Sequence, residues 1–477
     1  MRIYNNNMFV GREYELKILK NAIKSKRPEL GIVYGRRRVG KSALLKQAKS
    51  GKNCIYFEAL QKVTQKKQIE HFLQQLSKQA NTPQSMANNW RDAFEILTYY
   101  ISKGGHYIVF DEFPWMASGK TELVSLFKYY WDNHWKNNPG ITLMLCGSIA
   151  SYMIKHVVHS QALHNRKTFE IKLSPLPAKE AKLFFKNLRS DREIAQFMMV
   201  FGGIPKYLEQ IDPTQSLDIN VDKLCFQKSG FFVAEFETIF KEQFKKTRYY
   251  ERIVSVLSKK SVSKINLSNE LNIASGGGFN TYITSLEQAD FIRLFSPKAL
   301  LGKGDKTQKL VLWDEWLRFY FTYIQERQSI IELNTSPGLF QKACSNSIES
   351  YFGNAFEKFC IKNLTGILNA LEVNLHDVIS FGPFFRQRSR NNPSEKGLQI
   401  DILIHRRGNI LTLIECKFGL QPVGKTIISE IQHKVALLSI PKNYTLELVL
   451  IAAAGITPVL EQEAYFHRIL GLECLFE

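Results

Sequence analysis

The sequence has no C-x-x-C pair, no secretory leader and no apolar run long enough to span a membrane. Its seven cysteines are an odd number, and several lie inside apolar runs, which argues against a disulfide framework and against a zinc site. The first residues lack the apolar core of a secretory signal. The apolar stretches are much shorter than the ~20 residues of a spanning helix. These absences predict a reduced, cytoplasmic protein with no membrane partner.

Acidic residues are also fewer than basic residues. Lys plus Arg number 64 and Asp plus Glu number 44, which gives a net charge of +20. An excess of this size favours a polyanionic partner, and we expect nucleic acid, DNA rather than RNA. The alternative is a basic surface that is only solvated. The length of 477 residues is too great for one hydrophobic core and predicts about three domains.

The most informative stretch is a glycine-bounded loop between an apolar run and a helical pattern. Residues 35–42 have the pattern G-x-x-x-x-G-K-S, with apolar residues before them and helix-forming residues after them. Such a loop turns backbone N–H groups toward nucleotide phosphates, while Lys41 reaches the β and γ oxygens and the Ser42 hydroxyl ligates Mg²⁺. The residues expected to contact the nucleotide here are Gly35, Arg38, Val39, Gly40, Lys41, Ser42 and Ala43.

Two carboxylates end a second buried strand. The apolar residues 106–110 lead into Asp111 and Glu112, and Asp111 follows Lys41 by 111 − 41 = 70 residues. We expect Asp111 to hold Mg²⁺ together with Ser42, and Glu112 to orient and polarise the attacking water. Paired acids also end ordinary strands, but behind a phosphate loop they predict the other half of an ATPase site.

Two further polar residues are candidates for contact with the γ-phosphate. The apolar run 141–147 ends at Ser148, which is either a phosphate sensor or part of a plain strand-to-loop turn. Arg166 falls between that run and the next predicted strand, 169–173. It could deliver positive charge to the phosphate, within its own subunit or across a contact in a homo-oligomer. A solvated surface arginine is the alternative.

From residue 174 the pattern becomes helical, and residues 174–245 predict a helical lid and linker after the ATPase core of residues 1–173. At this point the sequence resembles the archaeal-type ATPases, which are P-loop proteins near the AAA+ and STAND ATPases. The motifs that carry the resemblance are residues 9–13 (FVGRE), 35–42, 110–112 (FDE), 146–148 (CGS), Arg166 and residues 202–208 (GGIPKYL). The resemblance implies ATP as the nucleotide, Gly11 and Arg12 near the adenine, and Pro205 in the lid beside the nucleotide.

Residues 246–325 predict three short helices and a β-hairpin, the pattern of a winged helix-turn-helix domain. The predicted recognition segment, residues 278–290, has no Lys or Arg but contains Glu287 and Asp290. A helix that enters the major groove normally presents basic residues, so we expect a packing or relay module rather than sequence-specific DNA binding.

Residues 326–477 predict a separate α/β domain with ionisable residues on a hairpin. Asp401 lies on one predicted strand, and Glu415 and Lys417 share a face of the next. If the hairpin register is even, Asp401 joins them, and the two carboxylates could hold Mg²⁺ while Lys417 stabilises charge. This D-x(13)-E-x-K arrangement resembles the PD-(D/E)XK nuclease-like fold and is similar to the C-terminal domain that accompanies many archaeal-type ATPases. That resemblance suggests supporting roles for Glu357 and Gln432, although Gln399-Ile400 stands where the nuclease motif has Pro before Asp.

The fold class that follows is α/β: a P-loop parallel-sheet domain with a helical lid, a winged-helix domain, and a restriction-endonuclease-like domain. The expected function is an ATP- and Mg²⁺-dependent ATPase switch whose C-terminal domain acts on nucleic acid. The alternative is a STAND-like regulator whose last domain binds DNA or protein without cleaving. A hairpin that is only salt-bridged, with no catalysis, is the structural alternative for Asp401, Glu415 and Lys417.

Overall fold

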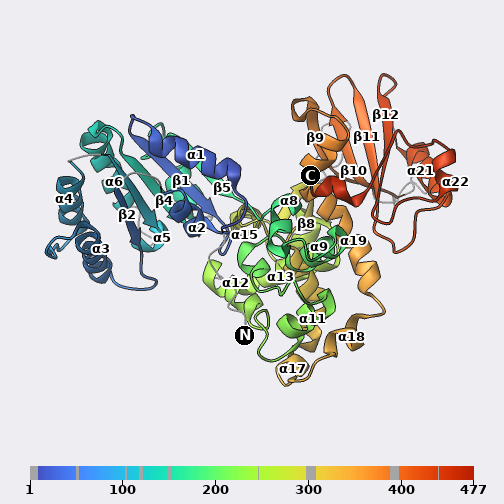
Figure 1. The fold of residues 1–477 in the computed structure, drawn as a ribbon, viewed down its shortest axis with the longest axis horizontal. Coiled ribbons are helices and arrows are strands. Elements are labelled where there is room, and N and C mark those ends of the chain that lie inside the picture. Colours follow the sequence, from blue (N-terminus) through green and yellow to red (C-terminus); the bar gives the residue numbers. More distant parts are fainter. Residues whose placement is uncertain are drawn as a thin grey trace. The chain divides into compact units, whose positions relative to one another are not determined.

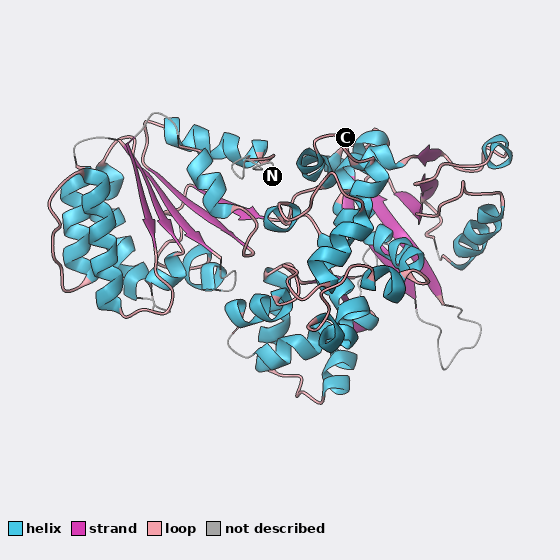
Figure 2. Ribbon diagram, turned by 60° about the horizontal axis from the view of Figure 1, so that its bottom comes forward, coloured by secondary structure: helices cyan, strands magenta, loops and turns pink. Residues whose placement is uncertain are grey.

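The computed structural model describes residues 9–49, 53–102, 105–117, 122–148, 152–244, 247–296, 308–386, 397–438 and 440–477. The chain divides into two compact units. The N-terminal unit contains Met1–Pro175 and Ile204–Lys206, and the C-terminal unit contains Leu176–Gly203 and Tyr207–Glu477. Each unit has its own β-sheet system flanked by helices (Figures 1 and 2).

The N-terminal unit is built on a five-stranded parallel sheet with the strand order β2-β3-β4-β1-β5. Its three central strands are largely apolar runs because both faces of the sheet are covered there, whereas the edge strands β2 and β5 also contain exposed polar residues. The parallel-sheet α/β fold predicted for this part of the chain is confirmed. The strands are β1 (Glu29–Gly35), β2 (Asn53–Glu58), β3 (His106–Asp111), β4 (Thr142–Gly147) and β5 (Phe169–Leu173).

Helices pack on both faces of this sheet, and side chains of β1 alternate between the two layers. Leu30 and Ile32 belong to the core under α3 and α4, whereas Val33 belongs to the core under α1 and α2. The carboxyl ends of the parallel strands therefore lie at one edge of a rigid layer, where functional loops can be placed. The helices are α1 (Glu13–Lys24), α2 (Lys41–Gln47), α3 (Gln65–Ala80), α4 (Trp90–Ile101), α5 (Phe113–Met116) and α6 (Glu122–Asn133).

The first part of the C-terminal unit is mainly helical. It includes three helices and a small antiparallel sheet of order β6-β8-β7, the elements that the sequence predicts for residues 246–325. Their interpretation as a winged helix stays a prediction. The elements are α8 (Ala178–Ala181), α9 (Asp191–Phe201), α11 (Leu217–Val221), α12 (Glu235–Gln243), α13 (Thr247–Lys259), β6 (Val262–Ser263), α14 (Lys264–Leu271), α15 (Gly277–Gln288), β7 (Ile292–Phe295), β8 (Lys309–Leu312) and α16 (Glu315–Phe319).

The last part of the C-terminal unit is a mixed five-stranded sheet of order β13-β12-β11-β10-β9. β9, β10 and β11 are antiparallel neighbours, whereas β11, β12 and β13 are parallel. The predicted hairpin is present as β10 and β11, and its core is apolar on the face covered by α21. The elements are α17 (Gln328–Ile331), α18 (Leu339–Cys344), α19 (Ile348–Lys362), α20 (Leu364–Ala370), β9 (Val378–Arg386), β10 (Leu398–Arg406), β11 (Ile410–Lys417), α21 (Thr426–Leu437), β12 (Thr445–Ala452), α22 (Pro458–Gln462) and β13 (Arg468–Leu470).

Candidate functional site

The loop between β1 and α2 has the backbone conformation that its glycines permit. Gly40 has φ 96°, in the left-handed region that favours glycine, and so does the non-glycine Arg38 with φ 67°. At Gly35 a side chain would meet the carbonyl oxygen of Leu173 at 2.3 Å, so only glycine fits between the two strands. Gly35 and Gly40 are therefore needed for the conformation of this loop.

Lys41 is buried at the end of this loop, with a relative exposure of 5%. Its ammonium group donates to the carbonyl oxygens of Arg36 at 2.9 Å and Gly35 at 3.3 Å. These neutral acceptors hold the charge inside the loop, where nucleotide phosphates would offer stronger, charged acceptors. Val39 is buried beside it, and Ala43 is exposed on α2.

Gly11, Arg12 and Pro205 lie close to the same loop. Gly11 and Arg12 both have positive φ, 67° and 62°, at the start of α1. The Arg12 guanidinium donates to the carbonyl oxygen of Val39 at 3.3 Å and to that of Ser174 at 2.6 Å. A side chain at Gly40 would lie 3.8 Å from Pro205 Cγ. Arg12 and Pro205 therefore adjoin the loop. The positions of Gly11 and Arg12 near adenine and of Pro205 beside the nucleotide, which the family resemblance implies, stay predictions.

Asp111 lies at the end of β3, beside Ser42, and is almost fully buried. Its Oδ2 accepts hydrogen bonds from the Ser42 hydroxyl at 2.6 Å and from the Tyr56 hydroxyl, and its Oδ1 accepts from the Glu112 amide at 3.0 Å. Tyr56 comes from the neighbouring strand β2, and no sequence motif pointed to it. Burial and the Asp111 charge raise the pKa of Tyr56, so its hydroxyl stays a donor. The predicted pair of Ser42 and Asp111 is brought together.

Glu112 follows Asp111 in a left-handed conformation, with φ 51°. Its Oε2 accepts from the Ser148 hydroxyl at 2.6 Å and from the Ser148 amide at 3.3 Å. Burial raises the pKa of Glu112, although the nearby Lys41 charge and the hydrogen bonds from Ser148 oppose that change. The ends of β3 and β4 therefore hold the predicted base and the predicted sensor in direct contact.

Arg166 lies in the segment before β5 and pairs with Asp132 at the end of α6. The two side chains form a bidentate contact, with Nε–Oδ1 at 2.7 Å and Nη2–Oδ2 at 2.8 Å. This contact lowers the pKa of Asp132 through the Arg166 hydrogen bonds. The structure thus shows Arg166 in an ion pair on its own unit, and its action on a phosphate stays a prediction.

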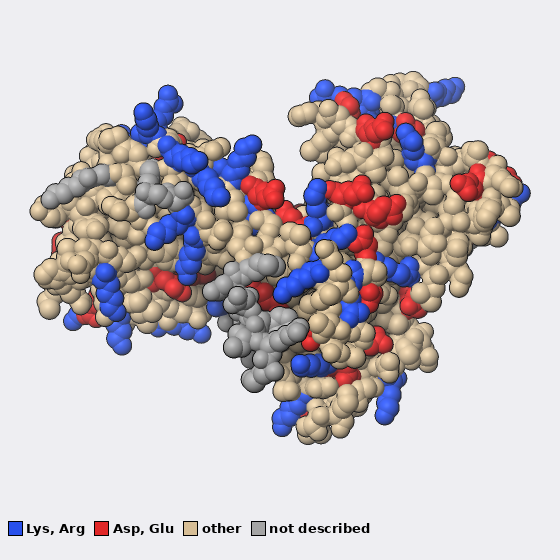
Figure 3. Space-filling view, viewed as in Figure 1, with Lys and Arg blue, Asp and Glu red and all other residues tan. Residues whose placement is uncertain are grey.

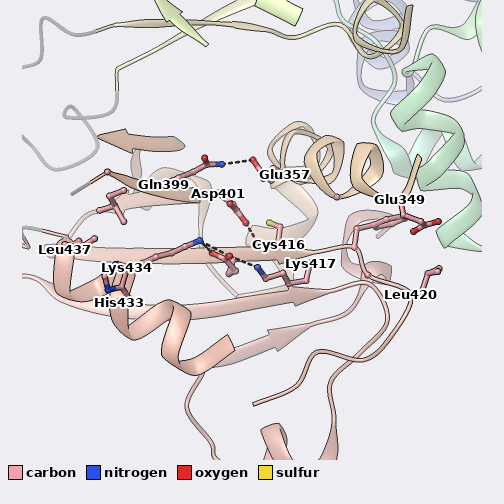
Figure 4. A pocket seen from close by; sticks show the side chains of 16 residues that line it. Glu349, Glu357, Gln399, Asp401, Cys416, Lys417, Leu420, His433, Lys434 and Leu437 are labelled. Carbon is pink, nitrogen blue, oxygen red and sulfur yellow. Dashed lines mark hydrogen bonds and ion pairs between the residues drawn. The ribbon is translucent and has the colours of Figure 1, made fainter. Parts of the chain in front are cut away.

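A second group of ionisable residues lines a cavity of about 720 Å³ in the C-terminal unit (Figure 4). Asp401 on β10 and Glu415 on β11 are both buried in its wall, with exposures of 5% and 2%. The register Ile402–Ile414 places Asp401 opposite Glu415, and Asp401 also lies where the pairing of β10 with β9 shifts. A bulge at such a point changes the direction in which side chains project from the strand. The predicted convergence of Asp401 and Glu415 is found.

Lysines from two elements neutralise Glu415. Lys417, on the same strand, is 3.0 Å from Oε1. Lys434 on α21 contacts both carboxylate oxygens, at 2.8 and 2.6 Å. Lys434 was not predicted: the helical residue expected to assist was Gln432, which is exposed and does not line the cavity. Burial lowers the pKa of Lys417, but the charge and hydrogen bond of Glu415 outweigh that effect and the pKa is raised.

Asp401 is a buried carboxyl group that lies near two other carboxylates. Its Oδ2 accepts the Cys416 amide at 2.9 Å. Burial, followed by the charges of Glu415 and Glu357, raises its pKa to about 7. Glu357 on α19 also lines the cavity, accepts a hydrogen bond from Gln399 at 3.5 Å, and has a pKa raised mainly by burial. Glu357, Asp401, Glu415 and Lys417 therefore line one cavity, whereas the predicted supporting residue Gln432 does not.

Both sites present oxygen atoms that suit Mg²⁺. Ser42 and Asp111 present two adjacent oxygens beside the phosphate loop, and Asp401 and Glu415 present two carboxylates at the cavity. One or two carboxylates with water and substrate phosphates are typical ligands of Mg²⁺, so both sets fit. Within the described residues no group of three His, Cys, Asp or Glu side chains could by itself hold a metal ion. Substrate or water must therefore complete either coordination shell.

Comparisons with known proteins bear on both halves of the chain. Residues 9–211 match the model of a family described as an ATPase domain predominantly from Archaea, and residues 320–426 match a family described as archaeal and bacterial proteins of unknown function. An uncharacterized protein of Methanocaldococcus jannaschii is 28% identical over 353 residues, which cover 74% of this chain and 76% of that protein. No helix among the described residues is long and apolar enough to cross a membrane.

Similar solved structures include a Walker-type ATPase of Pyrococcus abyssi, with a TM-score of 0.48 and 15% identity over 66% of this chain and 96% of that one. The ORC2 protein of Aeropyrum pernix, solved as ADPNP and ADP complexes, has a TM-score of 0.41 and 12% identity over 69% of this chain and 96% of that one.

Proposed function

We propose that the ATPase domain matched by residues 9–211 makes the protein an ATP-driven switch for its C-terminal unit. The observation that carries the ATPase assignment is the continuous hydrogen-bonded set Ser42–Asp111–Glu112–Ser148 at the carboxyl edge of the parallel sheet. It joins a metal-binding hydroxyl and carboxylate to a base and a sensor. Ligands in open α/β sheets bind at this edge.

Each residue of the set has a separate task in hydrolysis. Lys41 exchanges its backbone acceptors for phosphate oxygens, and this charge stabilises the transferring phosphoryl group. Ser42 and Asp111 would hold Mg²⁺, which would neutralise charge on the phosphates when bound. Glu112 orients the attacking water once the γ-phosphate has drawn Ser148 away from it. The raised pKa of Glu112 fits a group that accepts hydrogen bonds from water near neutral pH.

We propose a second activity for the C-terminal cavity, the Mg²⁺-dependent cleavage of nucleic acid. Asp401 and Glu415 would hold the metal ion, Lys417 would stabilise negative charge on the phosphate, and Glu357 would support the site from α19. The observation that favours this activity is the burial of two opposed carboxylates with two lysines around one open cavity. In the alternative function, that of a STAND-like regulator, the same cavity binds DNA or protein without cleavage.

Nucleic acid is the partner that the charge distribution favours. Residues 1–175 contain 27 Lys and Arg against 12 Asp and Glu, which is +15 of the total +20. On α1, Lys17, Lys20 and Lys24 are all exposed, and Lys and Arg side chains are common on the face of this unit shown in Figure 3. A basic surface increases the rate and affinity of binding to phosphate backbones.

The test is an incubation of the full chain with plasmid, single-stranded DNA or RNA, with Mg²⁺ or Mn²⁺, and with or without ATP. The matched variants are Lys41→Ala, which should abolish ATP hydrolysis, and Asp401→Ala, which should abolish cleavage but leave ATP hydrolysis intact. Cleavage that persists in a clean Asp401→Ala preparation would contradict the nuclease assignment. ATP-dependent self-association without cleavage, lost in Lys41→Ala and measured by light scattering, would favour the regulator instead.

A further inference from the structure

Glu415 has two ammonium partners with different roles in the cavity wall (Figure 4). Lys417 is shared, because it also lies 3.3 Å from Glu430. Lys434 contacts both oxygens of Glu415 and, among the described residues, has no other carboxylate within 4.0 Å. Its side chain is 22% exposed, whereas that of Glu415 is 3% exposed. Lys434 is thus the dedicated counter-ion of a buried carboxylate, placed at the boundary between the wall and the open cavity.

Asp401 provides an acceptor next to this pair. Its Oδ2 accepts the Cys416 amide, but its Oδ1 has no hydrogen-bond partner among the residues that the structure describes. Asp401 is 5% exposed, so this oxygen cannot be fully solvated. This oxygen belongs to a side chain that lines the cavity opposite Glu415, so it is available to bind a cation.

We propose that Lys434 is a movable counter-ion. It neutralises Glu415 in the absence of metal, is displaced when Asp401 and Glu415 bind a divalent cation, and then pairs with a phosphate group of the substrate. The proposal rests on the function proposed for this cavity. An ammonium group on a flexible four-carbon stem can change partner without movement of the helix that carries it. The substrate phosphate then replaces Glu415 as the negatively charged partner of Lys434.

The first test is a calorimetric titration of the full chain with MnCl₂ alone, without nucleotide. Lys434→Gln removes the competing charge and should bind Mn²⁺ more tightly, by on the order of tenfold, since a charged hydrogen bond to Glu415 no longer has to be broken. Lys434→Arg retains a charge and should stay close to the unmodified protein. Asp401→Asn identifies the heat that belongs to this site. Unchanged or weaker Mn²⁺ binding by Lys434→Gln would overturn the displacement step.

Lys425→Gln is the matched control for loss of a paired lysine. Lys425 directly precedes α21 and pairs with Glu463 at 2.6 Å, but it does not line the cavity. Its Mn²⁺ affinity should equal that of the unmodified protein. A tighter affinity there as well would show a general effect of lost charge and would overturn the specific role of Lys434.

The second test measures binding of a short fluorescein-labelled DNA duplex in Ca²⁺ by fluorescence anisotropy. Lys434→Gln should bind the duplex more weakly, by on the order of tenfold, although it binds the metal more tightly. A purely structural role would not move the two affinities in opposite directions. Equal duplex binding by Lys434→Gln and the unmodified protein would overturn the phosphate step. Failure of the unmodified protein to bind duplex would overturn that step and the proposed action on DNA, while the Mn²⁺ titration decides displacement separately.

Discussion

The carboxyl group of Asp401 should make the C-terminal sheet less stable as the pH rises. Its pKa is raised to about 7 by burial and by Glu415 and Glu357, from an unfolded value of about 3.9. The folded state therefore binds more protons than the unfolded state between these two values, and stability falls across that range. A difference of about 3 units at about 1.36 kcal/mol each corresponds to roughly 4 kcal/mol. This contribution is fully present below about pH 4 and is lost above about pH 7.

Asp401→Asn tests this reasoning, because it removes the charge and keeps an oxygen that can accept the Cys416 amide. In EDTA at about pH 8, we expect the variant to protect β10 and β11 from hydrogen exchange more strongly than the unmodified protein, by up to roughly 4 kcal/mol of opening free energy. At about pH 4 the difference should nearly vanish. Exchange of peptides from residues 398–417 is read by mass spectrometry and corrected for the intrinsic effect of pH.

The exposed residue Asp377, just before β9, provides the control, and Asp377→Asn should change protection at neither pH. Equal protection in Asp401→Asn and the unmodified protein at both pH values would refute the assignment of a destabilising buried charge. Lower protection of the variant at about pH 8 would show that the carboxylate stabilises the sheet.

Three further substitutions test the N-terminal unit. Glu112→Gln should retain ATP binding and lower kcat by about 10²–10⁴-fold, measured by phosphate release; unchanged turnover would remove its role as base. Tyr56→Phe deletes a donor to buried Asp111 and should lower the opening free energy of β3 by about 1.5–3 kcal/mol, read by hydrogen exchange without nucleotide; unchanged exchange would show that the hydroxyl gives no support. Arg166→Ala should lower ATP turnover by on the order of 10³-fold, whereas Asp132→Asn should not. If Arg166→Ala and Asp132→Asn lowered ATP turnover equally, the ion pair between these residues would have only a structural role.

Local sequence patterns predicted most strands, because the central strands of the N-terminal sheet are short, largely apolar runs and β5 alternates apolar with polar residues. The run 106–110 became β3, and the predicted strand 169–173 became β5 with the same bounds. The strand order β2-β3-β4-β1-β5 was not predicted. Neighbouring strands in a parallel sheet are joined through helices, so their order depends on long-range packing that no local pattern contains. The shift in pairing between β9 and β10 at Asp401 also depends on long-range packing and was not predicted.

The predicted site residues were those that belong to motifs with fixed spacing. Ser42 and Asp111 meet because the phosphate loop after β1 and the end of β3, which is separated from β1 only by β4, lie at the same edge of the sheet. Tyr56 and Lys434 were missed because neither belongs to a motif. Tyr56 reaches Asp111 from an adjacent strand, and Lys434 reaches Glu415 from a helix 434 − 415 = 19 residues later in the chain. Only the folded structure brings such residues to the site.

The buried carboxylates of the two sites are compensated by different means, and this difference affects how each one binds a cation. Asp111 accepts hydrogen bonds from neutral donors, which are Ser42, Tyr56 and a backbone amide. Glu415 pairs with two ammonium groups. A divalent cation that approaches Asp111 displaces no charge, whereas one that approaches Glu415 must first overcome repulsion from the lysines. We therefore expect the proposed metal binding in the C-terminal cavity to be weaker than metal binding at Asp111 unless a substrate phosphate pairs with the displaced lysine. Substrate and metal should then bind there cooperatively.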